Sequence, residues 1–166
     1  MIKELLCEKI ISNNKPSLYA DPLAWGVVNF IENSFSKTQI NFDSENTAII
    51  VVSDTCSKET IEKLYPLYKK GRSSPLKFAG ANPGVLAGLA SIIFKFRGPS
   101  IVLAMMQQHS GNALYALTKY WFTHEQASQV FVITHEYKSF NNYFKGTLLT
   151  SGSKDFHNEI NNLIEN

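Results

Sequence analysis

The chain has 166 residues, of which 44% are hydrophobic and 18% are charged. Because the charged share is below the ~25% that is usual for soluble domains, the composition predicts one domain with a large core, spanning residues 1–166. A net charge of +2 is too small to indicate a nucleic-acid-binding protein. Its longest apolar stretches are interrupted before the ~20 residues that a membrane span requires, so we expect no such span.

Cysteine usage and the absence of known motifs indicate which compartment and which cofactors to expect. Cys7 and Cys56 are too few and too far apart for a disulfide framework, and no signal peptide precedes them, so we expect a reduced, cytoplasmic chain. The sequence contains neither a P-loop nor a G-x-G-x-x-G motif, and we therefore expect no nucleotide cofactor. The His-Glu pairs at 124–125 and 135–136 lack the spacing of a helical zinc site, so we expect no metal.

The first half of the chain predicts two helices around one strand. Residues 23–35 have a helical pattern. Residues 47–53 form a short apolar run rich in β-branched residues, which is typical of a strand covered on both faces. After polar N-cap candidates, an amphipathic helix is expected to reach about Tyr68.

A helix made of small residues is predicted over 83–94, after a loop at 71–75. Its small side chains recur at three- and four-residue spacings: Gly84, Ala87, Gly88 and Ser91. We expect this stripe to be buried against a closely packed neighbour. Leucine in place of Gly88 should then overpack the core.

The second half predicts two further strands, 100–105 and 129–134, separated by a helix at 110–122. The residues expected to pack from that helix are Leu114, Leu117, Tyr120 and Trp121. Beyond Tyr137 the sequence is polar and aromatic, and we expect mainly loops. The order of elements predicts an α/β fold in which helices sandwich a mostly parallel, mixed sheet.

Several landmarks between residues 74 and 136 follow a recognisable order. A Ser-Pro pair at 74–75 precedes Asn82 and the small-residue helix, and Gly98-Pro99 precedes a strand, a polar turn and another helix. In this order they resemble the N-terminal half of the β-ketoacyl synthases. The resemblance implies a thiolase-like half as the fold of this domain.

In the β-ketoacyl synthases, the nucleophilic cysteine lies in the turn after the strand that corresponds to residues 100–105 of this chain. A helix N-terminus lowers a thiol pKa and stabilises an oxyanion, which is why a nucleophile works there. Counting from Gly98-Pro99 places the cysteine position on Gln107, whereas aligning on the start of the helix places it on Gln108. An amide is not a nucleophile, and neither His135 nor His157 matches the motifs of the family's C-terminal catalytic residues. The resemblance thus implies no catalytic residue and a degenerate turn.

The turn residues are Gln107, Gln108 and His109. Glutamine at this position resembles chain-length factors and decarboxylating loading synthases, and short ketosynthase-like subunits accompany complete ketosynthases in aryl-polyene-type pathways. The resemblance therefore implies a non-catalytic subunit that pairs with a full-length β-ketoacyl synthase in polyketide or fatty-acid-type elongation and helps shape its acyl tunnel. Acyl carrier protein would be met mainly through the partner. The implied dimer interface is the second strand: Ser100, Ile101, Val102, Leu103, Ala104 and Met105.

Three other readings stay open. One is a stand-alone malonyl-carrier-protein decarboxylase acting through Gln107 or Gln108, and another is a hydrolase using His109 and Ser110. The third is a homodimeric acyl-binding protein. A group of basic residues either forms a solvated helix face or meets an acidic partner: Lys63, Lys69, Lys70, Arg72 and Lys77.

Overall fold

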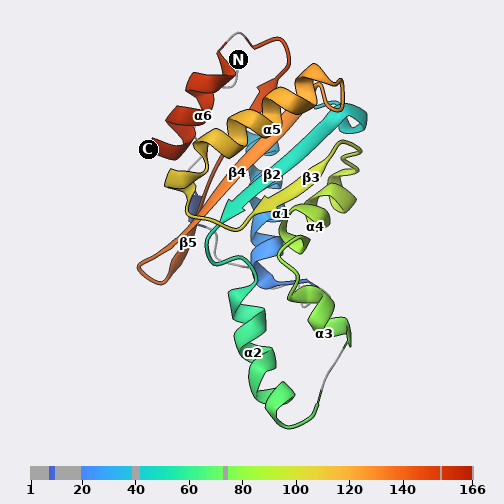
Figure 1. Cartoon of the computed structure of the whole chain (residues 1–166), viewed down its shortest axis with the longest axis vertical. Coiled ribbons are helices and arrows are strands. Elements are labelled where there is room, and N and C mark those ends of the chain that lie inside the picture. Colours follow the sequence, from blue (N-terminus) through green and yellow to red (C-terminus); the bar gives the residue numbers. More distant parts are fainter. Residues whose placement is uncertain (1–7, 10–19, 39–41, 73–74, 154, 166) are drawn as a thin grey trace.

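A five-stranded mixed sheet forms the centre of the molecule, with strand order β1-β5-β4-β2-β3 (Figure 1). The computed structural model describes residues 8–9, 20–38, 42–72, 75–153 and 155–165. Strand β2 (Thr47–Ser53) pairs in parallel with both β3 (Ser100–Leu103) and β4 (Gln129–Lys138). Strand β5 (Asn141–Thr150) pairs antiparallel with β4 and with the short β1 (Glu8–Lys9).

Helices cover both faces of the sheet, as the sequence predicts. One face packs against α1 (Pro22–Thr38) and α4 (Val85–Phe94), and the other against α5 (Gly111–Thr123) and α6 (Phe156–Glu165). Two more helices, α2 (Lys58–Lys69) and α3 (Pro75–Gly80), extend away from this body (Figure 1). One-turn 3₁₀ helices, η1 (Ser44–Asn46) and η2 (Gln107–His109), precede β2 and α5.

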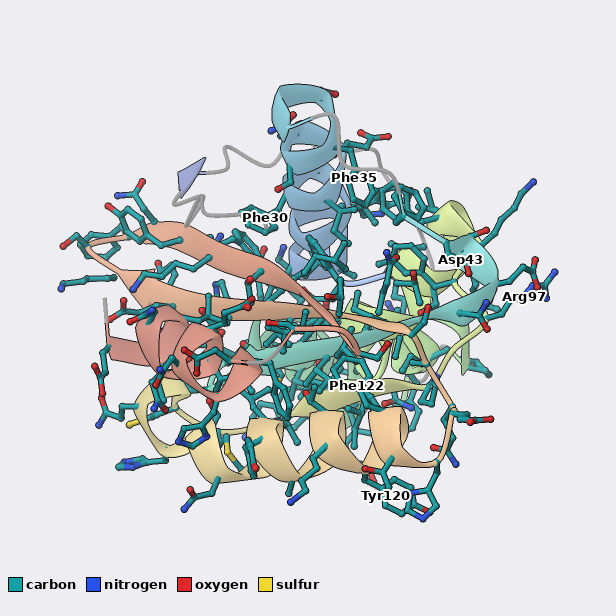
Figure 2. The ribbon with its side chains drawn as sticks, turned by 90° about the horizontal axis from the view of Figure 1, so that it is seen from above. Phe30, Phe35, Asp43, Arg97, Tyr120 and Phe122 are labelled. Atoms are coloured by element: carbon teal, nitrogen blue, oxygen red, sulfur yellow. The ribbon has the colours of Figure 1, made fainter. Side chains whose placement is uncertain are left out.

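Strand β2 is buried along its whole length because it is central and covered on both faces. Ile49 and Val51 pack on the α1/α4 side, while Ile50 and Val52 pack on the α5/α6 side. This alternation explains the unbroken apolar run. Figure 2 shows the same two layers, with Phe30 of α1 above the sheet and Phe122 of α5 below it.

The three predicted strands lie in one sheet, which confirms that part of the fold. The second strand is shorter than expected, because it ends at Leu103 and leaves Ala104 and Met105 in the segment that leads to η2. Gly98 explains how this strand reaches β2. A Cβ on Gly98 would lie 2.7 Å from the backbone carbon and oxygen of Thr47, so only glycine permits this close approach.

The expectation of loops beyond Tyr137 is wrong, because β4 continues to Lys138 and β5 returns beside it. The hairpin turn consists of Ser139 and Phe140, both with positive φ (51° and 61°), as in a type I′ turn. Such turns are usually marked by Asn-Gly or Asp-Gly. Ser-Phe carries no such signal, so the hairpin could not be predicted from the sequence.

The predicted burial of the small-residue stripe holds only at Ala87. Helix α4 begins at Val85 and buries a face formed by Leu86, Ala87 and Ala90, whereas Gly84 is exposed and Gly88 and Ser91 are only partly buried. No neighbouring atom lies within 4 Å of the position that a Cβ on Gly88 would take. The larger Leu86 turns toward the core, since burying its side chain removes more apolar area from water. The Cβ of a leucine at Gly88 would therefore meet open space, which contradicts the overpacking expected at this position.

Helix α5 follows the prediction except at one residue. Leu114 and Trp121 are buried, and Leu117 packs against them. Tyr120 is instead 50% exposed and stacks on His124 of the same helix end, pointing away from the sheet (Figure 2). The short helix α3 was not anticipated from the sequence.

Candidate functional site: a polar turn beside an open strand edge

The predicted turn connects the end of β3 to the start of α5. Its residues form η2, which lies at the carboxyl ends of the parallel strands and contacts β4 and α6. This is the end of a parallel sheet where ligand sites usually form. Gln107 is partly buried, whereas Gln108 and His109 are exposed.

The polar groups of the turn bond mainly to one another. The fully buried Ser110 donates its hydroxyl to the carbonyl oxygen of Gln107 at 2.6 Å. The Nε2 atoms of Gln108 and His109 are 3.4 Å apart, so the side chains of the two neighbours meet at the surface. Because Ser110 holds the turn and is shielded from solvent, it is not presented as a nucleophile for His109. The structure thus brings the three predicted residues together without an activated hydroxyl or thiol.

Strand β3 forms one edge of the sheet. Its residues pair with β2 on one side, from Ile49 opposite Ser100 to Val52 opposite Leu103. No strand among the described residues pairs with its other side. Ser100 is exposed and the remaining three residues are partly buried. Unpaired backbone groups along an apolar strand are a template for pairing with another chain.

The predicted interface residues therefore divide into two groups. Four form the edge strand itself, while Ala104 and Met105 belong to the connection toward the turn. Apolar surface continues around this edge. Met106 is 53% exposed, and on α4, which contacts β3, Ile92 is 76% and Ile93 is 37% exposed.

A second polar cluster lies at the carboxyl ends of β2 and β4, on the α1 side of the sheet. His135 is 2% exposed; its Nδ1 lies 2.9 Å from Ser53 Oγ and its Nε2 lies 2.9 Å from Asn142 Oδ1. Burial lowers the pKa of His135, against the opposing hydrogen bond to Asn142. A neutral imidazole fits both contacts, since it donates from one nitrogen and accepts at the other.

Cys56 completes this cluster in a structural role. Its backbone N–H donates to Ser53 Oγ at 2.9 Å and its thiol donates to the Ser53 carbonyl at 3.1 Å. Burial raises the pKa of the Cys56 thiol, so little thiolate forms at neutral pH. A pocket of about 290 Å³ adjoins the cluster and is lined in part by Asp21, Cys56 and Asn142.

Sequence reasoning considered His135 only as a metal ligand or a family catalytic residue, and missed this network. The three hydrogen-bonding residues come from two separate parts of the chain, and no spacing rule connects them. Among the described residues, no group of three or more metal-binding side chains occurs. No helix in the described part of the chain is long and apolar enough to cross a membrane.

Comparison with known proteins gives matches in structure. No family model and no curated protein matches the sequence. A chain in the complex of the ketosynthase ApeO with its chain length factor ApeC from Xenorhabdus doucetiae matches with a TM-score of 0.61 and 15% identity, over 81% of this chain and 59% of that one. A chain of the ishigamide ketosynthase/chain length factor matches with a TM-score of 0.53 and 12% identity, over 69% of this chain and 38% of that one.

These likenesses establish the fold. The chain has the thiolase-like ketosynthase fold that the order of its sequence landmarks implied. It spans less than two thirds of the length of either matched chain.

Proposed function

We propose that this chain is a non-catalytic, chain-length-factor-like subunit that pairs with a full-length ketosynthase through the edge of β3. The observation that carries the proposal is the unpaired edge of Ser100–Leu103 in a chain with a ketosynthase fold. The fold matches come from complexes of a ketosynthase with a chain length factor, which supports a partner of the same kind. Pairing at β3 would continue the sheet from one subunit into the other.

The turn fits a supporting role in such a complex. Gln107 is the more buried of the two glutamines, and its amide can fill space or hydrogen-bond an acyl carbonyl. The partner would supply the nucleophilic cysteine and the acid–base residues for condensation. This chain would supply part of the wall along which the acyl chain lies, in polyketide or fatty-acid-type elongation, including aryl polyene formation. Carrier protein would dock mainly on the partner. This chain would form a single domain beside the ketosynthase, and the complex would work in the cytoplasm.

Co-expression with a full-length ketosynthase of the same organism tests the proposal directly. We expect one complex on size-exclusion chromatography with light scattering, with the mass of a heterodimer. Val102→Asp places a charge on the edge strand and should abolish the complex, because burying an unpaired carboxylate is costly. The matched control is Phe140→Asp on the hairpin tip, where the side chain is 92% exposed, and this variant should pair normally.

Two outcomes would overturn the proposal. One is a stable monomer that does not bind the ketosynthase, and the other is a Val102→Asp variant that binds as tightly as the wild type. A complex with twice the mass of this chain alone would favour the homodimeric acyl-binding protein, because the same open edge suits a second copy.

A further inference from the structure

The arm formed by α2 and α3 has an apolar surface that the rest of the described chain does not cover. Helix α2 buries none of its residues, and the two helices extend away from the sheet (Figure 1). A groove of about 580 Å³ runs between them, lined mainly by apolar and aromatic side chains. Three of these are widely exposed, namely Tyr65 (57%), Tyr68 (74%) and Phe78 (76%).

Most of the large exposed apolar side chains lie on three helices that follow one another in the chain. Of the eleven large hydrophobic residues that are exposed in the described part, seven lie on α2, α3 and α4. Apolar side chains gathered around one groove, as Tyr65, Tyr68 and Phe78 are, mark an interaction site, whereas single exposed hydrophobics do not. Helix α3 directly precedes α4 in the chain, and α4 contacts β3, so one helix connects the arm to the open strand edge.

Charge on the arm is distributed unevenly. Near the body, the carboxylates of α2 are paired, Glu59 with Lys63 and Glu62 with Lys58. The far end of the arm carries Lys69, Lys70 and Arg72, and Arg72 lines the groove. The Lys69 ammonium lies 4.7 Å from the centre of the Tyr65 ring. An occupant that matches both features has an apolar face for the groove and carboxylates for its cationic end.

The strand edge is too small to hold a permanent partner by itself. Strand β3 has four residues, and a permanent interface usually buries about 2,000 Å² or more. Edge pairing alone is too small for that, so further surface must take part. Permanent interfaces are more apolar than transient ones. The apolar lining of the groove therefore favours the permanent partner over a transiently docking carrier protein.

We propose that the α2–α3 groove holds an amphipathic, acid-flanked helix of the ketosynthase partner, as a second contact beside the β3 edge. This inference rests on the proposed function. It adds that the arm reaches around the partner and that Tyr65, Tyr68 and Phe78 anchor it there.

Site-specific photo-crosslinking in the purified heterodimer tests the arm separately. Tyr68 is replaced by p-benzoylphenylalanine, and the matched control carries the same replacement at Phe140, whose side chain is exposed at the far hairpin. Illumination should link position 68, and not position 140, to a ketosynthase helix that bears Asp or Glu beside apolar residues. Mass spectrometry of the linked peptide identifies that helix.

Binding measurements with variants provide the second readout. The double variant Tyr68→Ser/Phe78→Ser should weaken heterodimer formation at least tenfold, and Arg72→Glu several-fold with a marked dependence on salt. Lys119→Glu, the same charge reversal on exposed α5, should leave the affinity unchanged.

The outcomes separate this proposal from the one on which it rests. If the heterodimer forms but position 68 links to nothing, or only to added carrier protein, the arm proposal is wrong and the proposed function stands. Unchanged affinity of the double variant would overturn it in the same way. If no heterodimer forms, both fail.

Discussion

The buried histidine predicts a defined dependence of stability on pH. The pKa of His135 is lowered in the folded protein because burial disfavours the imidazolium. In the unfolded chain, His135 has its ordinary pKa of ~6.5 and binds a proton as the pH falls below that value. In the folded chain it stays neutral until a lower pH is reached. The free energy of unfolding therefore decreases as pH falls below ~6.5, by up to about 1.4 kcal/mol per pH unit, until the lower folded pKa is reached.

His135→Gln separates this effect from other titrating groups. Glutamine stays neutral, so the variant loses the contribution of this one group to the pH dependence. At pH 7.5 the variant should be destabilised by roughly 1–3 kcal/mol, because Ser53 and Asn142 lose a well-placed buried partner. The ring contact with Phe144, at 5.0 Å between centroids, is lost as well.

Urea denaturation of the wild type and the variant, at pH 7.5, 6.5 and 5.5, measures the two effects. The difference in unfolding free energy between wild type and variant should shrink as pH falls. His109→Gln makes the same change on the exposed turn, where no buried hydrogen bond is lost, and should leave the stability at pH 7.5 close to that of the wild type. A difference between wild type and His135→Gln that stays constant from pH 7.5 to 5.5 would refute the reasoning.

Three further predictions concern the backbone and the turn. Gly98→Ala should lower stability by more than 1 kcal/mol and weaken β3, because the added Cβ would lie 2.7 Å from the Thr47 backbone; unchanged thermal unfolding would contradict this. Gly88→Leu should stabilise the isolated chain by up to ~1 kcal/mol through helix propensity, since its Cβ meets open space, and a loss in the same assay would contradict it. After incubation with malonyl carrier protein, intact mass spectrometry should show no acyl adduct on this chain, and an adduct on Ser110 would indicate an enzyme instead. The Gln107→Ala variant should retain partner-dependent activity within tenfold of the wild type.

The central strands were predicted correctly from the sequence because their burial on both faces determines which amino acids they contain. A strand covered on both faces, such as β2, needs apolar residues at every position, and that pattern is unambiguous. The face of α4 was not predictable in this way. Small residues at helical spacing are compatible with close packing or with an open surface, and only the competing Leu86 decided which face turned inward.

The parts that escaped prediction depend on residues distant in the chain. The His135 network requires that Ser53 and Asn142 meet one imidazole, which follows from the parallel register of β2 and β4 and from the hairpin. The hairpin was concealed by its Ser-Phe turn. Helix α2 was predicted as amphipathic, yet nothing in its periodicity shows that its apolar stripe faces a groove away from the sheet.

The two lateral sides of the sheet differ in how completely this chain covers them. On the β5 side, β1 pairs with the sheet, and α6 buries Ile160 and Leu163 against the same core as β4 and β5. On the β3 side, the outer edge of β3 has no partner strand among the described residues, and α4, which carries the exposed Ile92, packs beside it. The turn follows directly from that open strand. A subunit that pairs with β3 would therefore lie close to Gln107, so the contact that completes the sheet and the wall of an acyl tunnel would be formed by the same partner.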